Sequence, residues 1–163
     1  MIILGIDPGA SGAIAALCSL PIQRERVSGI IKADSSYRDL CDFIVGVAGN
    51  GQPVHGYLER VSAGPGAGAT GMFRFGQSFG ALQMLLTAYH IPFDLVSPVK
   101  WQVAMGCARP SVPKGAPKES QTEHKNRTKN RAQQVFPDVQ ITHAIADALL
   151  IAEYGRRLRN GEL

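Results

Sequence analysis

The sequence predicts an α/β fold in which a mixed five-stranded sheet is flanked by helices. Two observations support this prediction: strand-like and helix-like segments alternate along the chain, and most of the strands are apolar along their whole length. A strand that is apolar on both sides is buried on both faces, so helices must cover the sheet on each side. The 163 residues fit one domain, spanning 1–163, with a full-sized core.

Five segments have the pattern of β-strands. Residues 2–7 form an apolar run that ends in an Asp-Pro-Gly turn, and residues 13–18 return from that turn as the second strand of a hairpin. We expect the remaining strands at residues 26–32, 54–59 and 93–96.

Helices are predicted from caps and from the spacing of apolar residues. Ser35 or Ser36 can cap a helix that runs to about residue 48, where a Gly-Asn-Gly sequence stops it. Thr142 can cap the last helix, over residues 144–157. Further helices are expected at residues 72–89, around Trp101 and at residues 119–135.

The composition, 45% hydrophobic and 18% charged, is typical of a soluble globular protein. No apolar run reaches the ~18–20 residues that span a bilayer, and the first residues carry no basic leader, so we expect no membrane association and no signal peptide. Three cysteines form no CxxC pair, which favours a reducing, cytoplasmic location.

Basic residues are distributed unevenly in a chain of net charge +4. From Lys100 to Arg131 there are eight of them, opposed only by Glu119 and Glu123. A one-sided basic surface attracts a polyanion and gives salt-dependent binding. A solvated loop would explain the same charge, and residues 108–119, rich in Pro, Lys and Gly, are expected to be a mobile basic loop. A second basic cluster lies near the end of the chain: Arg156, Arg157 and Arg159.

Three acidic residues stand in apolar surroundings. Asp7 ends the first strand, Glu59 ends a later strand, and Asp147 lies within the apolar sequence HAIADALLIA. Burying an unpaired carboxylate is unfavourable, and hard cations such as Mg²⁺ prefer oxygen ligands. If the two strands are neighbours, Asp7 and Glu59 meet at one edge of the sheet, where Asp147 could complete a Mg²⁺ site. Two such ions, about 3.5–4 Å apart, can activate water and stabilise the leaving oxygen of a phosphodiester.

Each acid taken singly also has a structural explanation. Asp7 could only shape its turn, Glu59 could pair with Arg60 or Arg74, and Asp147 could pair with a neighbouring cation. The metal-site hypothesis explains all three together.

Four segments of the chain carry a resemblance to a known family. IILGIDPGASGAIA, YLERV with the glycine-rich loop and MFRFGQSFGAL after it, SPVKWQ, and HAIADALLIAEYGRR resemble the RuvC-type Holliday junction resolvases, in the small form common in bacteriophages and prophages. The resemblance runs from residue 2 to about residue 158. It implies a ribonuclease H-like fold and a homodimer in the bacterial host cytoplasm. It also implies paired cuts in four-way or branched DNA with two Mg²⁺ or Mn²⁺ ions per active site and no nucleotide cofactor.

The resemblance assigns the catalytic and metal-binding acids to Asp7, Glu59 and Asp147. The family has a further ligand, Asp or His, one helical turn before the last acid, where this chain has Ala144, which cannot bind metal. His143 shares a helix face with Asp147 and is a candidate ligand or general acid/base. Ala144 is either a natural replacement or one introduced to inactivate the enzyme, and either way it predicts impaired cleavage.

The resemblance also places the start of the helix after Glu59 at the centre of the junction. Phe73 and Phe75 are candidates for stacking on unpaired bases and Arg74 for a phosphate contact, although one or both phenylalanines could be core residues. We expect Trp101 to be a packing anchor rather than a base stacker. Further candidate DNA contacts are Lys100, Lys118, Lys125, Arg127 and Lys129.

Three other functions stay open at this point. An actin-like ATPase or sugar kinase shares the first-strand Asp and glycine turn, but it needs two such domains to enclose a nucleotide. A non-catalytic junction-DNA-binding module would have the same fold and an incomplete metal site, which Ala144 favours. An RNA-directed nuclease of the same fold would differ only in its substrate.

Overall fold

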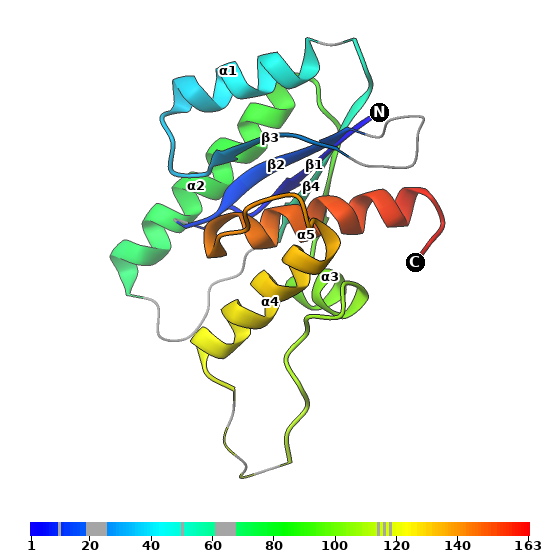
Figure 1. Ribbon diagram of the computed structural model, residues 1–163. Coiled ribbons are helices and arrows are strands. Elements are labelled where there is room, and N and C mark those ends of the chain that lie inside the picture. The colour runs from blue at the N-terminus through cyan, green and yellow to red at the C-terminus, as the bar shows by residue number, and fades with distance from the viewer. Residues whose placement is uncertain are drawn as a thin grey trace.

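A five-stranded sheet in the order β3-β2-β1-β4-β5 forms the centre of the protein (Figure 1). The computed structural model describes residues 1–9, 11–18, 26–49, 51–60, 68–113, 115, 117 and 119–163. The sheet is mixed, as predicted, because β2 pairs antiparallel with β1 and β3, whereas β4 pairs parallel with β1 and β5. The strands are β1 (Ile2–Ile6), β2 (Ala13–Cys18), β3 (Arg26–Lys32), β4 (Val54–Glu59) and β5 (Phe93–Val96).

Helices cover both faces of the sheet (Figure 1). α1 (Tyr37–Ala48) and α2 (Ala69–Ala88) pack on the face to which Ile2, Leu4 and Ile6 point. The opposite face, which includes Ile3, is covered by α5 (His143–Arg159), with α3 (Pro98–Ala104) and α4 (Gln121–Val135) beside it. In the part of the chain that the structure describes, none of the helices has the combined length and apolar character that a membrane crossing requires.

Helix α5 lies directly against β1 at Gly5. A Cβ atom at Gly5 would lie 2.1 Å from the carbonyl oxygen of Ala148 and 2.2 Å from the amide nitrogen of Ala152. Only glycine permits such a close approach of two backbones. Because Ala148 follows Asp147, this contact holds Asp147 near the end of β1.

The helices begin close to their predicted positions. α1 begins after Ser36, whose Oγ accepts a hydrogen bond from the Asp39 amide at 3.1 Å. α4 begins after Ser120 rather than at residue 119, because Ser120 and Glu123 form a capping box. α2 begins at residue 69 instead of 72, and α5 extends over His143–Arg159. Thr142 is the N-cap of α5, but its side chain makes no capping hydrogen bond.

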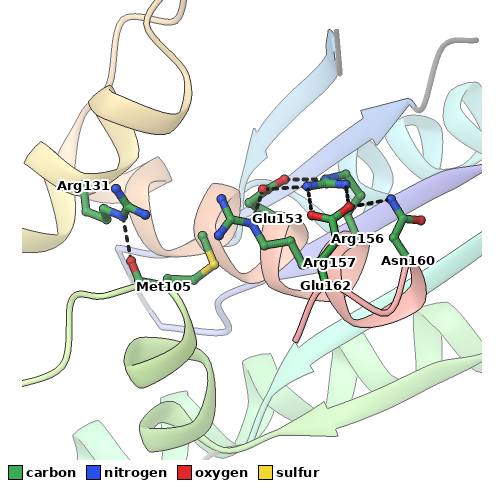
Figure 2. Close-up of polar contacts among 7 residues, drawn as sticks. All are labelled: Met105, Arg131, Glu153, Arg156, Arg157, Asn160 and Glu162. Carbon is green, nitrogen blue, oxygen red and sulfur yellow. Dashed lines mark hydrogen bonds and ion pairs between the residues drawn. The ribbon is translucent and has the colours of Figure 1, made fainter. Parts of the chain in front are cut away.

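The basic cluster at the end of α5 is largely neutralised within the protein (Figure 2). The carboxylate of Glu153, which is buried, accepts hydrogen bonds from the Nε of Arg156 at 2.8 Å and the Nε of Arg157 at 2.6 Å. Arg156 also donates to Glu162 at 2.6 Å. The sequence suggested a basic surface here, but two of its three arginines have carboxylate partners.

Candidate active site

Asp7 and Glu59 occupy equivalent positions at the ends of neighbouring parallel strands. The register of β1 and β4 places Ile6 opposite Leu58, so Asp7, the residue after β1, and Glu59, the last residue of β4, follow at the same edge of the sheet. The strands are therefore neighbours, which is the condition on which the sequence-based metal site depended.

A tight turn surrounds the carboxylate of Asp7. The Gly9 amide donates to Asp7 Oδ1 at 2.9 Å, and the Asp7 amide donates to the carbonyl of Ala13 at 3.0 Å. A Cβ atom at Gly12 would lie 2.2 Å from the Asp7 carbonyl oxygen and 2.7 Å from its Cγ. The turn therefore needs glycine at position 12, and it fixes the direction of the Asp7 side chain.

Trp101 fixes the carboxylate of Glu59. The indole Nε1 of Trp101, on α3, donates to Glu59 Oε1 at 2.8 Å. Trp101 is completely buried, which confirms that it is a packing anchor. The hydrogen bond to Glu59 was not predicted, because the two residues lie 42 positions apart and no local pattern connects them.

Burial raises the pKa values of all three carboxyl groups. For Glu59, burial and then the negative charges of Asp7 and Asp147 raise the pKa to about 7, against the hydrogen bond from Trp101. For Asp147, burial and the charge of Asp7 raise the pKa to about 7. Burial also raises the pKa of Asp7, opposed by the Gly9 amide and the charge of Lys125. The three acids therefore form one electrostatic cluster whose charged state is unfavourable.

The donor chemistry of this cluster fits a divalent cation. Its donors are carboxylate oxygens, which Mg²⁺ and Mn²⁺ prefer, and a cation would offset both the burial and the mutual repulsion of the charges. Among the described residues, no group of three His, Cys, Asp or Glu side chains is arranged to hold a metal ion. The side chains of Asp7, Glu59 and Asp147 would therefore have to draw together around an ion.

The two residues one turn before Asp147 differ in their surroundings. His143 is the first residue of α5 and is exposed, whereas Ala144 is half-buried. Within the described ranges, His143 belongs to no metal-binding group with the acids, so its role as a ligand or general acid/base stays a prediction.

Among the described residues predicted to contact phosphate, Lys125 is the one whose charge acts on the acids. Its charge lowers the pKa values of both Asp7 and Asp147. Lys100 is also exposed, and Lys129 is half-buried. Lys118 lies outside the described residues. In the predicted mobile loop, the described residues 108–113 form neither helix nor strand, and mobility there stays a prediction.

Arg127 is the predicted phosphate contact that already has an anionic partner. Its Nη2 donates to the carboxylate of Glu119, and His124 Nδ1 lies 3.1 Å from the same nitrogen. Sequence reasoning missed this ion pair, which joins the residue before the N-cap of α4 to the second turn of the helix.

The aromatic residues at the start of α2 have different surroundings. Phe73 is 68% exposed, so it is not a core residue, and Arg74 beside it is exposed as well. Phe75 is half-buried. Arg74 and Phe75 line a groove of about 1060 Å³ between α2 and the start of α1. Phe73 and Arg74 are therefore available to a ligand, whereas Phe75 is partly used in packing.

The sheet order, the helices on both faces and the acidic edge define a ribonuclease H-like α/β fold. The solved structures that share it include two of RuvC. The Thermus thermophilus RuvC complex with a Holliday junction substrate has a TM-score of 0.65 and 15% sequence identity, over 99% of this chain and 97% of that chain. A second Thermus thermophilus RuvC structure has a TM-score of 0.63 and 16% identity over the same shares. The chain therefore has the fold of RuvC, as the sequence predicted.

Neither a family model nor a curated protein matches the sequence of this chain. At 15–16% identity, the structural likeness establishes the fold and leaves the activity to be argued from the site.

Proposed function

We propose that this protein is a structure-selective endonuclease that cuts phosphodiester bonds in four-way and other branched DNA with the help of divalent cations. The observation that carries the proposal is the cluster of Asp7, Glu59 and Asp147. The three carboxyl groups, directly after β1, at the end of β4 and on α5, are buried and act on one another through their charges, which raises their pKa values. Structural ion pairs would explain such a cluster only if basic side chains of the protein neutralised the three carboxylates.

The residues of the chain have separate roles in this reaction. Asp7, Glu59 and Asp147 would hold Mg²⁺ or Mn²⁺, two ions per site. The ions supply Lewis-acid stabilisation of the phosphodiester and lower the pKa of bound water. Trp101 keeps Glu59 Oε1 in place through a 2.8 Å hydrogen bond. Lys125, exposed beside the acids, would contact a phosphate of the substrate.

The substrate is inferred from the fold and from the surface of the protein. A RuvC of the same fold is described in complex with a Holliday junction substrate. The chain has net charge +4, with an acid-poor basic region around α4 and the exposed Phe73 and Arg74 on α2. These features suit a branched polyanion with unpaired bases at its centre.

We also infer that the protein is the small phage or prophage form of the resolvase and acts as a homodimer in the host cytoplasm. Paired cuts in a junction with two-fold symmetry require two active sites related by the same symmetry. Light scattering after size exclusion, with and without a four-way junction, tests the dimer. A monomer in both conditions contradicts it.

A junction-cleavage assay tests the proposed function. The unsubstituted protein, Ala144→Asp and Asp7→Asn are each incubated with a labelled four-way junction in Mg²⁺ or Mn²⁺. We expect slow cleavage by the unsubstituted protein, cleavage that is severalfold or more faster by Ala144→Asp, and no cleavage by Asp7→Asn. Cleavage that persists in Asp7→Asn contradicts the assignment of the site.

A non-catalytic junction-binding module is the second candidate, because Ala144 removes one donor and no three-donor group is arranged among the described residues. Junction binding without nicks, unchanged in Ala144→Asp, favours this candidate. Preference for structured RNA or an RNA–DNA hybrid over the junction in competition would instead favour an RNA-directed nuclease.

A further inference from the structure

A polar groove of about 410 Å³ lies between α4 and the end of α3. Gly106, which follows α3, forms one wall, and side chains of α4 form the other. The α4 wall consists of three amides, two guanidinium groups and one carboxylate: Asn126, Asn130, Gln134, Arg127, Arg131 and Glu123. The groove is therefore rich in hydrogen-bond donors, and none of the described residues that line it contributes an apolar side chain.

The amides of the groove repeat at one-turn spacing. Asn126, Asn130 and Gln134 are four residues apart, so they lie on one face of α4, about 6 Å apart along its axis. All three are exposed, and each primary amide offers two donors and one acceptor oxygen. A row of this kind suits a ligand with regularly repeated acceptor groups.

The two arginines are held in place by the protein. Arg131 donates from Nε to the carbonyl oxygen of Met105 at 2.6 Å (Figure 2) and from Nη1 to Gln134 at 3.2 Å. Arg127 is held by Glu119, and its Nε is buried without a hydrogen-bond partner among the described residues. Guanidinium groups that are already ordered lose less side-chain entropy when they bind an anion.

Glu123, the one carboxylate among the described residues of the lining, caps the start of α4. Glu123 Oε2 accepts hydrogen bonds from the amide and the hydroxyl of Ser120, both at 2.8 Å. Glu123 is also the only acidic residue of α4, which carries four basic ones. A helix face that is merely solvated would mix both signs of charge, so this face favours an anionic ligand.

We propose that this groove is a second DNA site, which binds the sugar-phosphate backbone of a duplex arm beside the acid cluster. The inference rests on the proposed function and extends it from the cut bond to a neighbouring arm. Lys125, whose charge acts on Asp7 and Asp147, is exposed and stands next to Asn126 of the groove on α4, so this helix connects the acids with the groove. One DNA molecule can therefore contact both.

Equilibrium binding to a fluorescent four-way junction and to a linear duplex, measured by anisotropy in EDTA, tests the groove. Asn130→Asp places a negative charge in the donor row. Its matched control, Ala88→Glu, places one on the exposed end of α2. We expect Asn130→Asp to weaken binding about 3- to 10-fold and Ala88→Glu less than about twofold, because phosphate contacts dominate affinity. Arg131→Gln should reduce the slope of log affinity against log salt by about 1.

The outcomes separate the groove from the proposed function. If Asn130→Asp binds both DNAs as tightly as Ala88→Glu does, and Arg131→Gln keeps the salt slope, the groove is not a DNA site, even when the junction is still cleaved. Weaker duplex binding by Asn130→Asp supports the groove, even when the protein shows no cleavage. Absence of binding by the unsubstituted protein to either DNA overturns both. Thermal unfolding of each variant verifies that it is folded.

Discussion

Replacing Asp147 with Asn should stabilise the protein at neutral pH when no divalent cation is present. The substitution keeps the shape of the side chain and removes a charge that burial and Asp7 make unfavourable. The pKa of Asp147 is raised from 3.8 to about 7, so the folded state holds this proton more tightly than the unfolded chain does. The resulting stability is fully present below the unfolded pKa and is lost as the pH rises through the folded pKa.

The expected magnitude follows from the pKa shift. A shift from 3.8 to about 7, at 1.36 kcal/mol per pKa unit, corresponds to roughly 4 kcal/mol in all, of which roughly 3 kcal/mol is lost between about pH 5 and about pH 8. Glu59 titrates in the same range, and interacting groups share their titration steps, so the two losses do not simply add. Asp147→Asn should therefore be more stable than the unsubstituted protein by roughly 2–4 kcal/mol near pH 8.

Urea unfolding followed by circular dichroism, in EDTA across this pH range, measures the effect. The exposed Asp138 supplies the control, because Asp138→Asn makes the same chemical change at a position that is not buried. Adding Mg²⁺ near pH 8 should then stabilise the unsubstituted protein by mass action and have little effect on Asp147→Asn. The reasoning is wrong if the unsubstituted protein in EDTA is equally stable at both ends of the range, or if Asp147→Asn gains nothing at the upper end.

Substitutions at Gly5, Trp101 and Ser120 test the contacts that position the site. Gly5→Ala should lower the free energy of unfolding by about 3 kcal/mol, because its Cβ meets backbone at 2.1 Å. A Cβ atom at Gly46 would have no atom within 4 Å, so Gly46→Ala should raise the free energy of unfolding by about 0.5–1 kcal/mol. Equal effects of the two substitutions in urea unfolding would contradict the role of the close contact at Gly5. Trp101→Phe removes the donor to Glu59 and should raise the Glu59 pKa further above its ordinary value, as carboxyl NMR titration measures; an unchanged pKa would show that the hydrogen bond is unimportant. Ser120→Ala should lower stability by about 1 kcal/mol and Ser120→Asp much less, and equal losses would exclude capping as the cause.

The strands and their burial could be predicted because the signal is local. Each strand is a short apolar run bounded by turn residues, and β1 alternates between two cores that the structure places on opposite faces of the sheet. The cap at Ser36 was predicted for the same reason, since the hydrogen bond joins residues three positions apart. The position of Asp7 and Glu59 at one edge followed only once β1 and β4 proved to be neighbours.

Contacts between distant side chains could not be predicted, because many partners are compatible with the same sequence. Glu59 had Arg60 and Arg74 as candidate partners nearby, but its carboxylate accepts from Trp101 across 42 positions. Arg157 carried a charge that suggested a basic surface, and the structure pairs it with Glu153 one turn away. Arg157 and Glu153 are close in sequence, but the carboxylate of Glu153 is buried. Its burial depends on how α5 packs, which the sequence pattern does not reveal.

Ala144 is best understood from the electrostatics of the cluster that it adjoins. A carboxylate at position 144 would lie one turn before Asp147 on the same helix face, and would add a negative charge to groups whose pKa values are already raised. Without a cation it would destabilise the fold, whereas with one it would supply a further oxygen donor. Alanine therefore favours the stability of the metal-free protein over the affinity for metal, a common form of the trade-off between stability and activity.

Ala144→Asp and Asp147→Asn should consequently change stability in opposite directions in EDTA. Only Ala144→Asp should strengthen the response to Mg²⁺, and that response distinguishes a metal site from a merely strained cluster of acids.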